Sequence, residues 1–149
     1  MKSMAMAACV GTVLLTGGQV AAEWEERLGA AGKNGQELSA FVSRASEKHG
    51  DIGRRAAAFL VSGMPEYDLK VVDSDFLMEN LGFAMKAREE FPWCKHLPEE
   101  VFFNDVLPYA SLDETREAWR AGFYEQCRGM VKDCRTTTEA VQAINKNFF

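Results

Sequence analysis

Histidine is scarce in this sequence: His49 and His96 are the only two among its 149 residues. A catalytic triad, a zinc site or a general base built on imidazole therefore has at most two candidates. The sequence also lacks the HExxH, CxxC, Walker A, GxGxxG and EF-hand patterns, whose spacing lets a short segment hold a metal, a phosphate or a dinucleotide. We therefore predict no metal-binding and no cofactor-binding residue in this chain.

Cys94 and His96 are the nearest pair of a nucleophile and a base, two residues apart in a segment flanked by prolines. Such closeness in sequence is poor evidence for a catalytic dyad, because nucleophile and base normally come from different elements of the fold. A loop cysteine beside a solvated histidine is the simpler interpretation. We predict no catalytic residue here and keep a self-sufficient enzyme using these two side chains as a third hypothesis.

The patterns of β-structure are missing as well. No segment shows sustained alternation of polar and apolar residues with β-branched enrichment, and no Asn-Gly or Asp-Gly pair joins two such segments. Positive charge is also in the minority, since 17 Lys and Arg face 22 Asp and Glu. Nonspecific nucleic-acid binding needs a basic surface that releases counterions. The sequence thus predicts an all-α protein with no nucleic-acid partner.

An apolar segment opens the chain. Lys2 precedes the mostly apolar residues 4–15, and the small residues of Val20-Ala21-Ala22 follow. This order predicts a secretory signal peptide over residues 1–22, cleaved before Glu23, and export to the periplasm or the extracellular space. A retained membrane anchor is the alternative, but glycine, threonine and glutamine interrupt the apolar segment. We expect no stable membrane span after cleavage.

The rest of the chain has the length of about one domain. Residues 29–36 are small and turn-forming, so we expect residues 23–36 to be a flexible lead-in and residues 37–149 to be a helical domain. Apolar spacing, prolines and capping residues predict about six helices in an irregular orthogonal bundle, over residues 37–50, 52–63, 73–91, 98–107, 111–134 and from about 138 to the end.

Two of these helices carry residue-level expectations. Asn80 lies within the apolar stripe of the third helix, where a buried amide that bonds to the backbone is favoured over a ligand contact. In the fifth helix, Ser111 and Glu114 form the S-x-x-E spacing of a capping box. Its predicted buried stripe contains Trp119, Phe123, Cys127 and Met130. The tryptophans and Tyr109 are more typical of core than of a ligand groove.

After cleavage three cysteines remain, Cys94, Cys127 and Cys134. Cys127 and Cys134 are two helical turns apart, roughly 10 Å, which is too far for a disulfide in a continuous helix. An internal disulfide would therefore use Cys94. The alternative is three small buried hydrophobic side chains.

Residues 75–149 resemble the region that precedes the catalytic core in bacterial secreted transglutaminase-like proteins. The matching motifs follow one collinear order over about half of the chain: Glu79-Asn80, Ala87-Arg88, Pro92-Trp93, NDVLPY at 104–109, Asp113-Glu114, Trp119-Arg120 and Ala143-Ile144-Asn145. The resemblance implies a papain-like core with a Cys-His-Asp triad beyond residue 149. None of the surroundings typical of that triad occur here, and Cys94 does not match the family's nucleophile.

These observations lead to a first hypothesis, a non-catalytic N-terminal helical domain of an exported transglutaminase-like enzyme that acts on amide bonds. Its partner would be the catalytic core in the same polypeptide. The chain ends on two phenylalanines without a capping glycine, so we expect it to continue and expect Ile144, Phe148 and Phe149 to dock on the core. A free-standing secreted helical binding module is the second hypothesis, since the sequence has many aromatic residues and no catalytic motif.

We expect the exported protein to begin at Glu23, because the apolar segment ends on small residues that a signal peptidase accepts at positions −3 and −1. Mass spectrometry of the secreted chain measures this directly. Protein made without an export route should keep residues 1–22. A mature N-terminus far from Glu23 would contradict the prediction.

Overall fold

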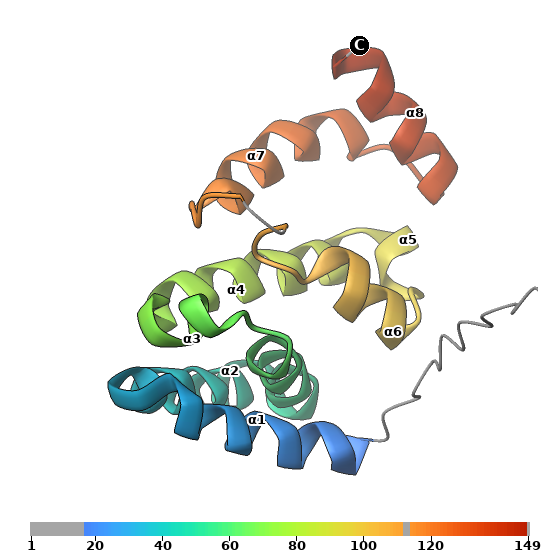
Figure 1. Ribbon diagram of the computed structural model, residues 1–149. Coiled ribbons are helices and arrows are strands. Elements are labelled where there is room, and N and C mark those ends of the chain that lie inside the picture. Colours follow the sequence, from blue (N-terminus) through green and yellow to red (C-terminus); the bar gives the residue numbers. More distant parts are fainter. Residues whose placement is uncertain (1–16, 112–113, 149) are drawn as a thin grey trace, which may run out of the picture.

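The computed structural model describes residues 17–111 and 114–148, with side chains from residue 23 onward. All regular elements within this part are helical, which confirms the all-α prediction. The main helices are stacked in three tiers (Figure 1). From bottom to top the tiers contain α1 (Gly17–Ala31) with α2 (Gly35–Ser62), then α4 (Ser74–Glu90) with the short α5 (Pro92–Lys95) and α6 (Glu99–Val101), and finally α7 (Trp119–Val131) with α8 (Thr137–Phe148).

The predicted flexible lead-in over residues 23–36 is wrong, because α1 and the 3-10 helix η1 (Gly32–Asn34) occupy this segment. α1 packs against α2 and α3 (Glu66–Val71). Trp24 and Leu28, one helical turn apart, lie against the main core, and Ala31 is buried. Apolar residues at this spacing were the signal for the helix. Residues 1–16 of the predicted signal peptide lie outside the described residues, and its boundary at Ala22 falls within α1.

The small residues between α1 and α2 make a tight connection instead. Gly32 has a φ of 59°, in the left-handed region that favours glycine. Asn34 then donates from Nδ2 to the carbonyl oxygens of Leu69 and Val72, each at 2.9 Å. The turn-forming composition at 29–36 thus marks an ordered junction that ties α1 to the end of α3.

The α2 segment is two helices that meet at Gly50, as the sequence predicts. Gly50 has φ 67° and ψ −151°, which breaks the helical path. Just beyond the break, the backbone of Gly53 lies against the preceding helix, and a Cβ at that position would be 2.2 Å from the carbonyl oxygen of Ala45. The two halves therefore pack closely, and glycine is required at both positions for different reasons.

The apolar core has two parts. The main core lies between the lower and middle tiers and includes Phe41, Leu77 and Phe102, each 0% exposed. A smaller second cluster attaches the upper tier to α4 and α5, and its buried members are Phe91, Cys94, Tyr124, Val131 and Ala140. The upper tier thus depends on a small apolar contact area and on the polar contacts described below.

Three helix predictions need correction. Residues 64–72, expected to be a connector, contain α3. The predicted helix over 98–107 is α6 followed by a π-helix, η2 (Phe102–Val106), in which the Leu107 amide bonds to the Phe102 carbonyl at 3.0 Å. The predicted helix from Ser111 begins only at Trp119. Ser111 and Glu114 do form a turn, with the Ser111 amide donating to the Glu114 carboxylate at 2.8 Å.

The predicted buried stripe of α7 is also wrong. Trp119 and Phe123 are 37% and 53% exposed, whereas Tyr124 and Val131 are buried. Tyr124 packs its ring on Phe83 and Phe91 of the middle tier, and its hydroxyl reaches the Glu90 carboxylate. A tyrosine with an acceptor at its tip suits this position better than a phenylalanine, which has no group to meet the carboxylate.

Three glycine-to-alanine substitutions should separate the two requirements in α2. Gly50→Ala should cost about 1–2 kcal/mol because of its positive φ, and Gly53→Ala about 3 kcal/mol because its Cβ would overlap backbone. Gly129→Ala in α7, where a Cβ meets nothing within 4 Å, should be neutral or stabilising by up to about 1 kcal/mol. Urea unfolding followed by circular dichroism gives the three values. Equal effects of Gly53→Ala and Gly129→Ala would show that the close approach is absent.

Candidate functional site

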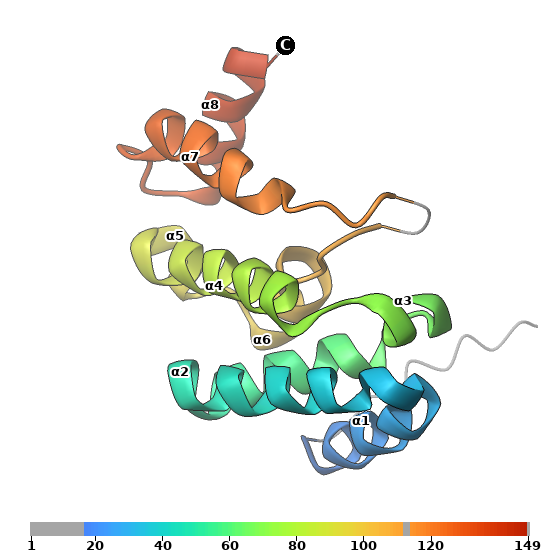
Figure 2. The same cartoon turned by 90° about the vertical axis from the view of Figure 1, so that its left-hand side faces the viewer.

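The segment over residues 107–118, here called the strap, links η2 to α7. It extends over α3 and the start of α4 before it returns to the upper tier (Figure 2). Its residues 112 and 113 lie outside the described part of the chain. The strap has little regular structure of its own, so its position depends on side-chain contacts with α3 and α4. Two polar clusters provide these contacts.

The first cluster surrounds Asp68 of α3, whose side chain is 0% exposed. Tyr109 donates its hydroxyl to Oδ2 at 2.7 Å. Arg116 donates from Nε to the same oxygen at 2.9 Å, and its Nη2 lies 2.8 Å from it. Burial and the neighbouring carboxylate raise the pKa of Tyr109 above its usual value, so its hydroxyl stays a donor. The carboxylate is thus fully partnered by two strap residues.

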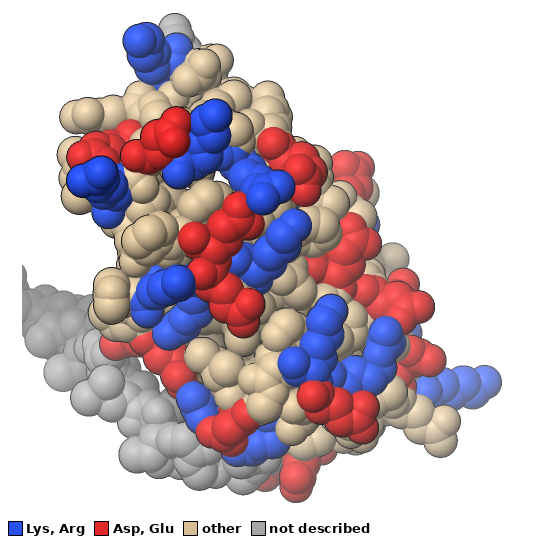
Figure 3. All heavy atoms as spheres, turned by 180° about the vertical axis from the view of Figure 1, so that it is seen from behind, with Lys and Arg blue, Asp and Glu red and all other residues tan. Residues whose placement is uncertain are grey.

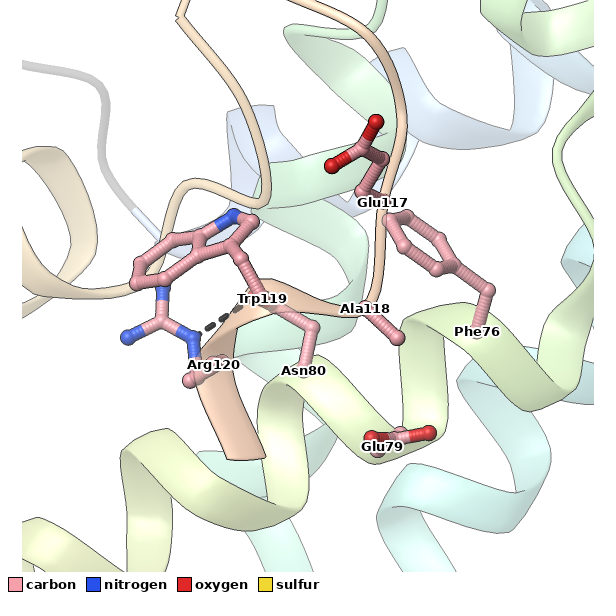
Figure 4. Close-up of a pocket in the computed structure, with 7 residues that line it drawn as sticks. All are labelled: Phe76, Glu79, Asn80, Glu117, Ala118, Trp119 and Arg120. Atoms are coloured by element: carbon pink, nitrogen blue, oxygen red, sulfur yellow. Dashed lines mark hydrogen bonds between the residues drawn. The ribbon is translucent and has the colours of Figure 1, made fainter. Parts of the chain in front are cut away.

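The second cluster is centred on Arg120 at the start of α7 (Figure 4). Its Nε donates to Asn80 Oδ1 at 2.7 Å, and its Nη2 donates to the Pro108 carbonyl at 2.8 Å. The guanidinium also lies 4.5 Å from the centre of the Trp119 ring. Asn80 in turn donates from Nδ2 to the Leu107 carbonyl at 2.8 Å. One arginine and one asparagine therefore join α4, the strap and α7.

Arg120 is unusual because its hydrogen-bond acceptors within the described chain are neutral. Burial alone lowers its pKa to about 10, which still leaves it charged at neutral pH. Glu79 and Glu117 line the adjacent cavity, but it measures only about 10 Å³. A space of that size holds about one water molecule. The cluster is therefore a structural joint and has no room for a ligand.

The predicted role of Asn80 as a buried amide bonded to backbone is confirmed. It is 5% exposed, and its donor goes to a main-chain carbonyl. Several motifs that carry the family resemblance meet at this point: Glu79-Asn80, the end of NDVLPY, and Trp119-Arg120. Tyr109 is buried as expected, but Trp119 is partly exposed and donates from Nε1 to the Tyr109 carbonyl at 2.8 Å. Sequence reasoning missed Asp68, Arg116 and Arg120, since none lies in a local pattern.

Cys94 and His96 are not arranged as a dyad. Cys94 is buried in the second cluster, and burial raises the pKa of its thiol to about 11. A thiol in such surroundings is rarely ionised and is a poor nucleophile. His96 is exposed in the following turn. Cys94, Cys127 and Cys134 are all free thiols, and Cys134 packs against the same cluster as Cys94.

His49, the other histidine, lies beside the break in α2 and lines a groove of about 460 Å³ with Lys48 and Lys86. Its Nε2 is buried without a hydrogen-bond partner. Burial, and then the nearby Lys48 charge, lower the pKa of His49. Within the described residues no three His, Cys, Asp or Glu side chains are grouped so that they could hold a metal ion.

The predicted docking residues of α8 have different surroundings. Ile144 packs partly against the second cluster. Phe148 is 39% exposed, and Val141, one to two turns earlier, is 50% exposed. Phe149 lies outside the described residues. The apolar side chains of α8 are thus divided between the second cluster and the solvent.

Acidic and basic side chains are interspersed on the face shown in Figure 3, where no stripe of one sign stands out. None of the helices over residues 17–111 and 114–148 combines the length and the apolar character that crossing a membrane requires. Comparison of the chain with protein-family models, with curated proteins and with solved structures finds no match. A functional proposal therefore has to be argued from the residues themselves.

Asn80→Ala should destabilise the fold by about 2–4 kcal/mol, because it leaves the Leu107 carbonyl and the Arg120 guanidinium without their partner in a buried place. Asn104→Ala is the matched control, since exposed Asn104 also donates to a carbonyl at 2.8 Å. Its cost should stay within about 0.5 kcal/mol. The free energy of unfolding in urea measures both. Equal costs would contradict the assigned role of Asn80.

Proposed function

We propose that this chain is a non-catalytic helical accessory domain of an exported transglutaminase-like enzyme acting on amide bonds, and that α8 docks on the catalytic core of that enzyme. The proposal begins from the resemblance of residues 75–149 to the region preceding such cores. It is also supported by the surroundings of Cys94, whose thiol is buried and has a raised pKa.

The observation that carries the docking role is the exposure of Val141 and Phe148. The two residues are seven apart, so they lie on one side of α8. The opposite contact, through Ala140 and Ile144, already holds the helix to the second cluster. A helix attached on one side and apolar on the other is suited to join two packed units.

The coding sequence after the Phe149 codon tests the proposal most directly. An open reading frame that encodes a Cys-His-Asp core would support it. An immediate stop codon would contradict it and would favour the second hypothesis, a free-standing secreted binding module.

The purified chain offers a physical test of the docking face. Val141→Ser with Phe148→Ser should reduce self-association in light scattering, because the pair exposes apolar surface worth on the order of 1–2 kcal/mol per side chain. The free energy of unfolding should change by less than about 1 kcal/mol.

Ile144→Ser is the matched control on the other side of α8. It should destabilise the fold by about 2 kcal/mol, since it places a hydroxyl against the second cluster. If the Val141 and Phe148 pair behaves like Ile144→Ser, both side chains are already packed within this chain and α8 has no free face for a core.

A further inference from the structure

A groove of about 610 Å³ lies between α3 and the strap. The most exposed large apolar side chain of the described residues, Tyr67 at 73%, stands on one side of it, with Val71 at 53% one helical turn later. Val72 and Phe76 add apolar surface to the lining. Tyrosine and valine exposed together beside an arginine are typical of protein interfaces, where aromatic and arginine side chains supply much of the binding energy.

The charges of the groove indicate what it would bind. Three carboxylates, those of Asp68, Asp73 and Glu114, line it with a single guanidinium, that of Arg116. Arg116 is already paired with Asp68. Asp73 and Glu114 remain, and each uses one carboxylate oxygen to hold a backbone amide, of Phe76 and Ser111 respectively. Both keep negative charge facing the groove.

We propose that this groove is a docking site for a polypeptide segment in which apolar side chains alternate with lysine or arginine. The apolar side chains lie on Tyr67 and Val71, and the basic groups face Asp73 and Glu114. The surface is separate from Val141 and Phe148 of α8, so the proposal does not depend on the docking of a catalytic core. The walls are held in place by the Asp68 cluster, which limits the reorganisation needed on binding.

The probe is a fluorescein-labelled peptide of about 12 residues with alternating leucine and lysine. We expect it to bind the purified chain in fluorescence anisotropy. A peptide with glutamate in place of lysine, or serine in place of leucine, should bind at least about tenfold more weakly. High salt should weaken the lysine peptide, because part of the attraction is between exposed charges.

Two variants locate the site. Tyr67→Ser with Val71→Ser should raise the Kd about tenfold. Glu114→Gln should raise it about threefold and reduce the salt dependence, because glutamine keeps an acceptor for the Ser111 amide but removes the charge. Phe123→Ser, equally exposed on α7, is the control and should leave the Kd unchanged. Circular dichroism checks that all variants remain folded.

Three results would overturn the proposal: no binding of the leucine-lysine peptide, equal binding of the glutamate peptide, or the same loss in the Phe123 control. Sedimentation of the free chain covers a further occupant. A dimer abolished by the Tyr67 and Val71 substitutions would assign the groove to a second copy of this chain instead.

Discussion

The buried carboxylate of Asp68 constrains the position of everything that follows η2. An ionised group without exposure is tolerated only when hydrogen-bonded and paired, and loss of one partner leaves a charge that costs several kcal/mol. Both partners, Tyr109 and Arg116, belong to the strap. The strap therefore cannot leave α3 without exposing or orphaning this charge, which holds an otherwise irregular segment in place.

The Arg120 cluster continues that constraint into the upper tier. The second apolar cluster under α7 and α8 has only five buried members, too few to fix the tier by hydrophobic contact alone. Arg120 joins Asn80 of α4 and Pro108 of the strap with directional hydrogen bonds. Such bonds determine orientation more strictly than apolar contact does. The pose of α7, and with it the exposed side of α8, is thus coupled to the contact between the strap and α3.

Local sequence patterns predicted local features well. Gly50 marked the break in α2, and the place of Asn80 in an apolar stripe predicted a buried amide. Asp68 gave no such signal, because its partners lie 41 and 48 residues further along the chain. The lead-in failed because the glycines of 29–36 outweighed the pair Trp24 and Leu28. The stripe of α7 failed because Tyr124, counted as half-polar, is buried with its hydroxyl on a carboxylate. Periodicity identifies an element but not which side meets its neighbours.

The π-helix η2 has a consequence for how this chain tolerates changes in length. Its Leu107 amide bonds five residues back to Phe102, so the segment holds one residue more than an α-helical turn would. Deleting one residue between 103 and 106 would restore regular α-helical bonding locally and yet rotate all that follows by about 100°. The Leu107 carbonyl would then turn away from Asn80. Improved local geometry would come at the expense of the joint, which makes η2 a register setting that neither insertion nor deletion can improve.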